Sequence, residues 1–464
     1  MNRSINYIFL VVFIIILYLL FPTQNSVIDA YSYAGQVKYA VDLYHPHHLL
    51  HNPLNYYILE TLNFIGFEID ALNLGKFINS LFVLGSCLVL FEIISNFISD
   101  KKSVFLLTLI VLFSYGTWRF GTENEVYIEP IFFSITGSFY FLKFIQTKKF
   151  FFLCWTGIFA ATACLFHQIH FFWWLGLLIG AIYFSNFIKS FSIFFLTGLI
   201  VPITYFLVIS IVLQQNLNLE NILHFVLHDF YQGSADTAFN LRGLIMTPIS
   251  LVRSFVQVHP IVWILIKSNL FYVIPLAVIF LLIISISISK ERKLNFHKNP
   301  TNSSFLYTHI LILILQFGFA VFAKGNVEFM VMIPFLLIII ISAYLSFSNS
   351  FLFKIVLILF VWNFSFGIYP NHRYQFYDDR QFVDYLIQNS EEKVILKNLV
   401  TRSKYFYETG KSTENFIIHE KLNQSEFNSI IYENKSILTD VIDYPDIFNR
   451  QKFMNSTNNG GGIY

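Results

Sequence analysis

Long apolar stretches separated by short polar ones dominate the pattern of this chain. Two typical ones are "YIFLVVFIIILYLLF" near the N-terminus and "FYVIPLAVIFLLIISISIS" at 271–289. An apolar segment that reaches about 18 residues with its flanks can cross a bilayer as one α-helix. We therefore expect about eleven spanning helices, at 5–22, 74–98, 103–117, 128–146, 150–166, 169–188, 191–213, 268–289, 305–323, 328–347 and 351–369.

The composition agrees with this pattern. Of the 464 residues, 56% are hydrophobic and only 12% are charged, and the mean hydropathy is +0.60. A soluble domain of this size could not bury so much apolar surface, whereas a bilayer can cover it. The expected fold class is thus an all-α polytopic membrane protein. The net charge is only +2, so the charge balance does not point to nucleic acid as a partner.

The N-terminal segment and the cysteines each have two interpretations. Arg3 precedes the first apolar stretch, as in a signal peptide, but no small-residue cleavage site follows, so we expect an uncleaved helix. Cys87, Cys154 and Cys164 fall inside predicted helices. We expect them to be packing residues rather than a disulfide or a metal set.

Lysines and arginines in short loops predict the orientation. They gather at 99–103, 146–150, 186–190 and 289–300, and Lys354 begins the last helix on the same side. The positive-inside rule makes this side cytoplasmic. We expect a cytoplasmic N-terminus and, with an odd number of spans, an extracytoplasmic C-terminus, in a bacterial or archaeal cell membrane.

Two regions depart from the spanning pattern. Arg253, His259 and Pro260 favour an interfacial or re-entrant helix at 250–267, because a span there would move the basic loop that follows to the other side. Beyond Tyr369 charged residues become frequent. The stretch "DDRQFVDYLIQNSEEKVILKNLV" is typical of a helix followed by a short strand, and "NNGGGIY" of a flexible tail. We expect a membrane domain at 1–370, with an external loop at 22–73, and a small extracytoplasmic α/β subdomain at 371–464.

Ionisable side chains gather in five loops that this topology places on the external face. A site at a membrane boundary has this form, with functional groups on loops held by a rigid bundle. The alternative is that these loops are polar because they are wet. It explains the asymmetry less well, because the cytoplasmic loops are short and basic, while these are mixed in charge and rich in histidine and aromatics. The candidate residues are Asp29, His45, His47, His48, Arg119, Glu123, Glu125, Tyr127, His167, His170, Arg242, Lys324, Asn326 and Glu328.

Several candidates have a simpler interpretation. Asp29 could cap the helix that follows it, and Glu125 could favour a helix dipole. His167 and His170 share a helix face and could pack there, while Lys324 could anchor the membrane edge.

The histidine-rich segment "HPHHLLHNP" allows three interpretations. His45, His47 and His48 are too closely spaced for a helical zinc pair at i and i+4. Pro46 and Pro53 predict a turn, and histidines that alternate in an extended turn could bind a metal or a phosphate. Packing at the membrane interface is the third interpretation.

Four blocks of the sequence resemble a known family: "IDAYSYAGQVKYAVDLYHPHHLLHNPL", "TWRFGTENEVYIEP", "FHQIH" and "GNVEFMVMIPFLL". They are similar to the GT-C superfamily of membrane glycosyltransferases, in the branch related to protein O-mannosyltransferases. The resemblance covers about residues 5–370. It implies transfer of a sugar from a polyprenyl-phosphate-linked donor to an acceptor hydroxyl on the external face, with inversion. It also implies Asp29 as general base, a role that one positioned carboxylate can fill.

The same resemblance suggests roles for the other candidates. The departing lipid phosphate needs cationic or hydrogen-bond-donating groups, for which the candidates are His45, His47, His48, Arg119, Arg242 and Lys324. The candidates for sugar or acceptor binding are Glu123, Glu125, Tyr127, His167, His170, Asn326 and Glu328. Many members carry two adjacent acidic residues in the first loop, whereas here Ala30 follows Asp29. The sequence therefore requires no cofactor and leaves a divalent metal open.

Other functions remain as alternatives. A transporter or flippase for lipid-linked saccharides normally has ionisable residues or broken helices at the bilayer midplane, where we expect uninterrupted helices. A polysaccharide polymerase or ligase would share the lipid-linked donor, and a scaffold would not need the clustered His and Glu. The expected partners are membrane lipids, a polyprenyl-phosphate sugar, and an acceptor that is a protein, a glycolipid or a polysaccharide.

Overall fold

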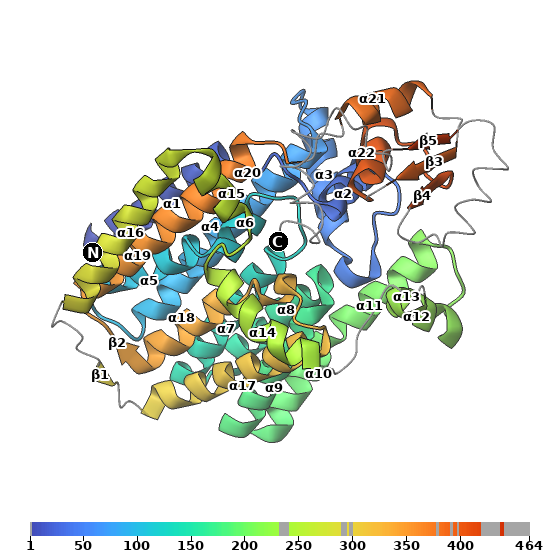
Figure 1. Ribbon diagram of the computed structural model, residues 1–464. Coiled ribbons are helices and arrows are strands. Elements are labelled where there is room, and N and C mark those ends of the chain that lie inside the picture. The colour runs from blue at the N-terminus through green and yellow to red at the C-terminus, as the bar shows by residue number, and fades with distance from the viewer. Residues whose placement is uncertain are drawn as a thin grey trace.

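Figure 1 shows the computed structural model, which describes residues 2–231, 241–288, 295–296, 300–376, 380–389, 393–396, 399–418 and 437–439. The helices of the bundle are α1 (Asn2–Leu20), α4 (Ala71–Ser95), α5 (Lys101–Leu112), α6 (Tyr115–Gly121), α7 (Glu129–Thr147), α8 (Phe150–Phe166), α9 (Phe171–Phe184), α10 (Phe187–Gly198), α11 (Ile200–Leu207), α16 (Val273–Ile288), α17 (Pro300–Phe322), α18 (Ile333–Tyr344) and α19 (Asn349–Asn363).

Shorter elements connect these helices. They are α2 (Ile28–Tyr39), α3 (His51–Phe64), α12 (Leu219–Val226), α13 (His228–Tyr231), α14 (Leu241–Phe255), α15 (Ile261–Ser268), α20 (Tyr369–Arg373), α21 (Arg380–Gln388) and α22 (Leu399–Thr409). The 3₁₀ turns are η1 (Pro46–His48), η2 (Gln168–His170), η4 (Leu270–Tyr272) and η5 (Val327–Met330), and the π turns are η3 (Val208–Val212) and η6 (Phe364–Ile368). The strands are β1 (Asn295–Phe296), β2 (Leu345–Ser346), β3 (Lys393–Leu396), β4 (Phe416–Ile418) and β5 (Ile437–Thr439).

The protein is an all-α polytopic membrane protein, as the apolar stretches predicted. Seven helices of the described residues are long and apolar enough to cross a membrane, and the bent pair α5–α6 would make an eighth. Helices lie at all eleven predicted positions, but three of them are apolar helices of only 10–17 residues. The number of eleven spans therefore stays a prediction.

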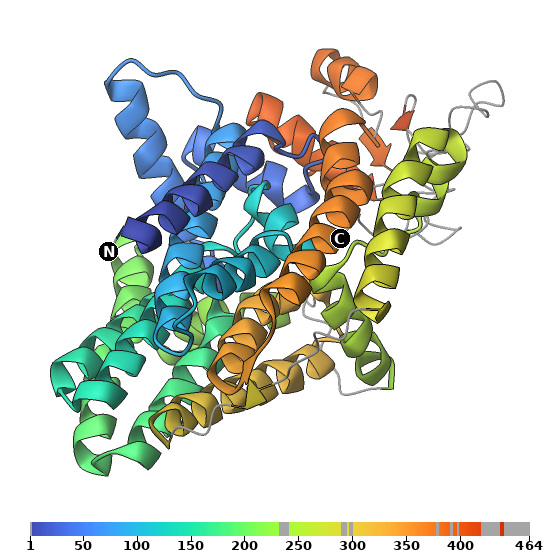
Figure 2. The same cartoon turned by 90° about the vertical axis from the view of Figure 1, so that its left-hand side faces the viewer.

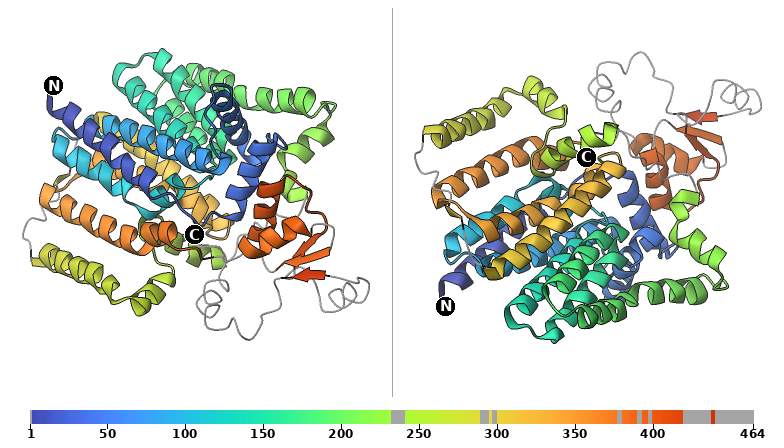
Figure 3. Two further views of the ribbon diagram at one scale, coloured as in Figure 1. Left: turned by 90° about the horizontal axis from the view of Figure 1, so that it is seen from above. Right: turned by 90° about the horizontal axis from the view of Figure 1, so that it is seen from below.

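The connections between helices gather alternately at two ends of the bundle (Figure 1). At one end β1 pairs antiparallel with β2, and the Asn349 side chain donates to Asp100 over 2.6 Å. At the opposite end, which we call the loop end, α2, α3 and the C-terminal elements lie together in two perpendicular views (Figures 1 and 3). The loops predicted to share a face therefore meet at the loop end.

One apolar segment is broken, because α5 and α6 are bent by 64°. The π turns η3 and η6 continue the candidate spans Phe187–Val212 and Asn349–Arg373 without a break. The expectation of uninterrupted helices is thus wrong for α5–α6, where the bend lies near the middle of the pair. Residues 250–267 are divided between α14 and α15 and contain no candidate span, which agrees with their predicted exclusion. Figure 2 shows α1, α19 and α16 running along the side of the bundle.

The C-terminal elements form a small α/β unit against the loop end. Its three strands are parallel in the order β4-β3-β5, and α21 and α22 pack on each other beside them. The predicted helix and short strand at 378–400 correspond to α21 and β3. A Cβ on Gly35 of α2 would lie 2.7 Å from the Phe406 ring, so α22 packs closely on α2. The predicted tail "NNGGGIY" lies outside the described residues.

Candidate functional site at the loop end

Asp29 lies in the first turn of α2, just after the segment that leaves α1. The N-cap of α2 is Val27, which has an extended backbone (φ −82°, ψ 176°), so the interpretation of Asp29 as a cap is wrong. The Asp29 side chain is exposed, and a carboxylate in a first turn still benefits from the helix dipole. Asp29 therefore presents a charged carboxylate at the surface of the loop end.

A buried network ties the α6–α7 connection to the segment before α2. Arg119 Nη1 donates to Glu123 Oε2 over 3.0 Å, and Arg119 Nη2 donates to the Asn25 carbonyl over 3.1 Å. The Ser26 hydroxyl donates to Glu123 Oε1 over 2.8 Å. Arg119 is 3% exposed and Glu123 is 1% exposed. Both charges already have protein partners, which favours a structural role over the phosphate and sugar binding that the resemblance implies.

Helix α4 also holds the α6–α7 connection in place through hydrogen bonds. The Asn79 side chain donates to the carbonyls of Glu123 and Glu125, each over 2.7 Å. The Asn124 amide donates to a backbone carbonyl of α2 over 2.9 Å. A Cβ on Gly75 would lie only 1.9 Å from Asn124 Oδ1, so only glycine permits this close approach. These hydrogen bonds of the α6–α7 connection with α4 and α2 hold Glu125 near the first turn of α2.

Three carboxylates from separate segments, Asp29, Glu125 and Glu328, lie close enough to interact electrostatically. The Tyr127 hydroxyl and the Asn326 amide donate to Glu328 Oε2 over 2.8 Å and 3.1 Å. Burial raises the pKa of Glu125 well above its usual value, and the negative charges of Asp29 and Glu328 raise it further. Glu125 Oε1 is buried and has no hydrogen-bond partner among the described residues. A protonated Glu125 can donate a hydrogen bond to a ligand oxygen.

We expect Glu125 to make stability depend on pH. A carboxyl whose pKa is raised on folding contributes stability that is fully present below its unfolded value, here about 4.5, and is lost as pH rises through the raised pKa. Glu125→Gln keeps the neutral form at every pH. The melting temperature of this variant should therefore rise relative to that of the wild type as pH increases above about 5. Tryptophan fluorescence during thermal unfolding measures this difference. Glu60→Gln, at an exposed carboxylate, is the control, and a pH-independent difference for Glu125→Gln contradicts the prediction.

The histidine segment is a 3₁₀ turn followed by α3, so the predicted extended turn is wrong. Pro53 lies in the first turn of α3, where its missing N–H costs nothing. The His45 and His48 rings stack with centroids 4.3 Å apart. Burial lowers the pKa of His48, and the neighbouring histidines, His45 first, lower it further. His48 is therefore neutral near pH 7 and can contribute a ring N–H but no charge.

The metal alternative for these histidines finds no geometric support. Within the described part of the chain, no three His, Cys, Asp or Glu side chains are placed to hold an ion. His47 Nδ1 lies 3.0 Å from Gln168 Oε1, and His51 Nδ1 lies 2.6 Å from Glu129 Oε1. The buried His51–Glu129 pair escaped the sequence analysis, because nothing in the local pattern links residues 78 positions apart.

The structure separates the two histidines of the "FHQIH" block. The His167 ring lies 5.3 Å from the ring of Tyr127, the donor to Glu328, and burial and the neighbouring histidines lower the pKa of His167. His170 is turned into the bundle, where its Nδ1 lies 2.7 Å from the Ser134 hydroxyl. His167 thus belongs to the site, whereas His170 joins η2 to α7.

The remaining basic candidates lie where α14 meets the turn between α17 and η5. Lys324 has a left-handed backbone (φ 55°) and precedes Gly325. A Cβ on Gly243 would lie 3.4 Å from the Lys324 Cα. The preceding residue, Arg242, is exposed and therefore lies beside this turn. Asn326 and Glu328 follow in the same turn, which links these basic residues to the carboxylates.

Two voids lie on either side of the Pro46 carbonyl and of α12. One is an apolar groove of about 730 Å³ between α8–α11 and α12. The other is a polar cavity of about 910 Å³ lined by His45, His224, His228 and Arg402. The Gln168 amide donates to the Tyr205 hydroxyl over 2.9 Å and to the Pro46 carbonyl over 3.0 Å, at the boundary between the two voids. Helix α12 separates the two voids: Ile222 and Val226 line the groove, and Asn221 and Phe225 line the cavity.

Two residues of this boundary were missed in the sequence. Arg402 lies in the C-terminal unit, more than 350 positions from His45, and Tyr205 lies inside an apolar stretch. Only the groove, which is visible in the structure alone, could have identified Tyr205 as a functional candidate.

No protein-family model matches the chain, and no curated protein sequence matches it significantly. The geometry of the loop end therefore carries the functional interpretation.

Proposed function

We propose that this protein is a glycosyltransferase that moves a sugar from a polyprenyl-phosphate donor to an acceptor hydroxyl. The observation that carries this proposal is the junction of an apolar groove with a His- and Arg-lined cavity beside an exposed carboxylate. Asp29, Tyr33 and Gln36 follow one face of α2 at i, i+4 and i+7. Gln36 lines the polar cavity, as does Ala40 directly after the helix, so this face runs from Asp29 to the cavity.

The two voids suit the two parts of a lipid-linked donor. The groove is lined by Phe, Trp, Leu, Val and Pro side chains and offers few polar groups to an isoprenoid chain. The cavity offers the Arg402 guanidinium, whose Nε donates to Thr413 Oγ1 over 2.7 Å and whose fork of N–H donors suits a phosphate. The histidines add ring N–H donors. A donor lying across the boundary at Pro46 would place its tail in the groove and its phosphate in the cavity.

The proposed reaction is a single displacement. Asp29 accepts the proton of the acceptor hydroxyl, whose oxygen forms a bond to the anomeric carbon. The bond from that carbon to the phosphate oxygen breaks, and its electron pair leaves with the polyprenyl phosphate. Arg402 and the neighbouring N–H donors stabilise the departing phosphate. Glu125, whose pKa is raised by burial, and Glu328 would bind sugar hydroxyls.

The direct test is transfer from a set of radiolabelled polyprenyl-phosphate sugars in membranes that contain the protein. Formation of a labelled product that is absent from control membranes supports the proposal, and the absence of transfer from every donor refutes it. A flippase would use the same groove, so movement of the donor across the bilayer without a new glycosidic bond would favour that alternative. The buried His309 does not favour a transport path, because each of its ring nitrogens lies 2.8 Å from an oxygen partner, the Phe305 carbonyl or the Ser138 hydroxyl.

We further propose that the loop end faces the outside of a bacterial or archaeal cell and that the N-terminus is cytoplasmic. The basic connections at 99–103, 146–150 and 186–190 lie at the opposite end, where the positive-inside rule expects the cytoplasm. Labelling of single introduced cysteines by an impermeant reagent tests this. Glu60→Cys should react from outside the cell, and Lys148→Cys only from inside.

We expect Gly198→Leu to weaken use of long-chain donors. A Cβ at this position lies 3.2 Å from the Trp174 ring and projects into the groove. Excluding about two methylene groups from the groove costs ~1.6 kcal/mol, which corresponds to a rise of about tenfold in KM. Steady-state kinetics with a long-chain and a short-chain donor measure the effect, which should be smaller for the short chain. Gly318→Leu is the matched control, because a Cβ there meets no atom within 4 Å. Equal effects of the two variants would contradict the groove assignment.

A further inference from the structure

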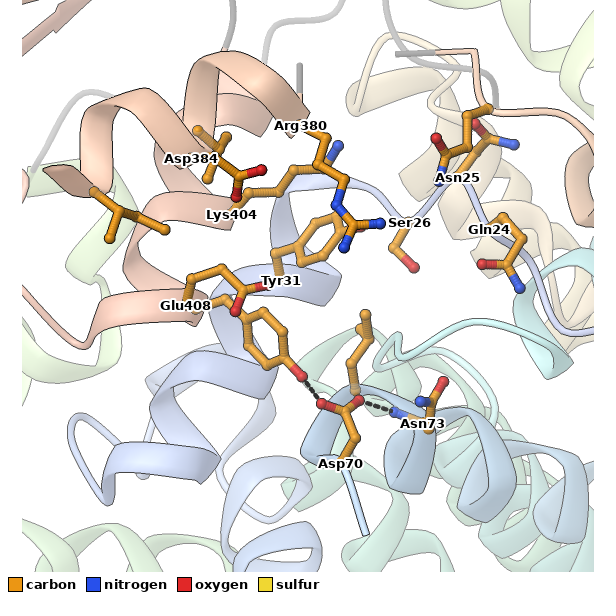
Figure 4. Close-up of a pocket in the computed structure, with 15 residues that line it drawn as sticks. Gln24, Asn25, Ser26, Tyr31, Asp70, Asn73, Arg380, Asp384, Lys404 and Glu408 are labelled. Atoms are coloured by element: carbon orange, nitrogen blue, oxygen red, sulfur yellow. Dashed lines mark hydrogen bonds between the residues drawn. The ribbon is translucent and has the colours of Figure 1, made fainter. Parts of the chain in front are cut away.

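We infer that a second, polar cleft at the loop end binds the saccharide part of the acceptor. The cleft measures about 520 Å³ and lies between the α1–α2 connection, the start of α4, and helices α21 and α22 (Figure 4). It is separate from the groove and the cavity assigned to the donor, with which it shares no lining residue. Its role as an acceptor site rests on the proposed transferase activity, whereas saccharide binding does not.

The walls of the cleft are held in place by hydrogen bonds across the domain boundary. The Tyr407 hydroxyl on α22 donates to Asp70, which also caps α4 by accepting from the Asn73 N–H over 3.0 Å. Lys38 Nζ on α2 donates to the Tyr407 carbonyl over 3.1 Å. These contacts join segments more than 300 positions apart. A cleft built in this way is largely formed before a ligand binds, which lowers the entropy cost of binding.

The lining chemistry selects a neutral ligand rich in hydroxyl groups. Arg380 and Lys404 oppose three carboxylates, those of Asp70, Asp384 and Glu408. An anionic ligand would meet these carboxylates, and an apolar ligand would desolvate charges without pairing them. Hydroxyl groups both donate and accept, so they can satisfy carboxylates, cations and the amide side chains of the cleft together.

The half-buried Tyr31 ring offers a surface for a sugar ring. The Tyr407 ring, with its centroid 5.8 Å away, is only 5% exposed and supports Tyr31 from behind. In Figure 4 the Arg380 guanidinium extends from α21 toward Ser26 and Tyr31. The apolar face of a pyranose can pack on tyrosine while its hydroxyl groups meet the polar rim.

The cleft is connected to the proposed catalytic residues. Tyr31 is two residues from Asp29 in the first turns of α2. Ser26 lines the cleft and donates to Glu123 in the buried network below. Asp29 does not line the cleft, and side chains two positions apart leave a helix in different directions. A saccharide on Tyr31 therefore lies at the same helix end as the general base, and the hydroxyl group that reacts would belong to a group attached to it that extends around the start of α2 to Asp29.

Binding of short neutral manno-, gluco- and galacto-oligosaccharides to the full-length purified protein, without donor, tests this inference by isothermal titration calorimetry. We expect at least one of them to bind, and Arg380→Ala and Tyr31→Ala each to weaken that binding about tenfold. Arg373→Ala, at an exposed arginine outside the cleft, should not change it. Unchanged melting temperatures for the variants exclude unfolding as the cause.

Three results would overturn the inference: no neutral oligosaccharide binds, Arg380→Ala and Tyr31→Ala bind as tightly as the wild type, or anionic oligosaccharides bind more tightly than neutral ones. The kinetic test separates the two proposals. If the transferase proposal holds, Arg380→Ala raises the KM of the acceptor and leaves the KM of the donor unchanged. If saccharides bind but no transfer occurs, the transferase proposal fails while the saccharide site stands.

Discussion

Replacing Asp29 with asparagine should reduce sugar transfer at least about 100-fold, because a positioned general base typically contributes between about 10² and 10⁴ to the rate. The exposed Asp29 carboxylate can accept the proton of the acceptor hydroxyl, whereas an amide has no comparable basicity. The first turn of α2 is capped by the backbone of Val27 rather than by Asp29, so the variant should fold. Initial rates with a radiolabelled donor in membranes measure the loss.

Measuring kcat and donor affinity together distinguishes the possible roles of Asp29. Because Asp29 acts on the acceptor hydroxyl, its replacement should lower kcat and leave donor affinity close to that of the wild type. Glu60→Gln removes another exposed carboxylate of the same loop and should retain full activity. Transfer by Asp29→Asn at the wild-type rate would exclude Asp29 as the base. Loss of donor binding would instead assign Asp29 to the donor.

Replacing Arg119 with methionine should destabilise the protein by about 3–5 kcal/mol, because it leaves the Glu123 carboxylate buried without its cation. The same change removes the hydrogen bond from Arg119 to the Asn25 carbonyl, which positions the segment before α2. Thermal unfolding of the purified protein, followed by tryptophan fluorescence, measures the loss. Arg373→Met, at an exposed arginine, should change the melting temperature little.

A double variant distinguishes a structural Arg119 from one that binds phosphate. Arg119→Met/Glu123→Met removes both charges, and well-packed apolar pairs often replace buried ion pairs with little loss of stability. A structural role predicts that the double variant regains stability and transfer activity relative to Arg119→Met. Regained stability with no activity would return Arg119 to the phosphate-binding role that the resemblance implied.

The spanning helices were predictable because their signal is local. A continuous apolar stretch in a bilayer must form its own backbone hydrogen bonds, which only a helix can do within one segment. For example, α7 at Glu129–Thr147 was expected at 128–146, and α4 at Ala71–Ser95 was expected at 74–98. The break was less visible, because the bend between α5 and α6 occurs within one continuous apolar stretch. Polar residues in the loops marked the face that carries the site, since the loop topology follows from the order of the helices.

The roles of individual polar residues could not be predicted in this way. Arg119 and Glu123 stood among the best candidates for ligand binding, yet each neutralises the other in a buried network. Arg402 had no distinguishing local pattern, yet it lines the cavity with His45. In both cases the role depends on which groups lie nearby in space, and local sequence spacing does not show these neighbours.

The sequence by itself determined that the chain is a polytopic membrane protein and that its unusual polar residues meet at one end. Both follow from the length and order of apolar segments, which obey short-range physical rules. Only the tertiary structure decided that the apolar groove lies beside the His- and Arg-lined cavity, that burial and neighbouring carboxylates raise the pKa of Glu125, and that a polar cleft forms between α2 and α22. Each of these depends on burial and on charges from segments far apart in the chain, because desolvation and electrostatic interaction act through space rather than along the sequence.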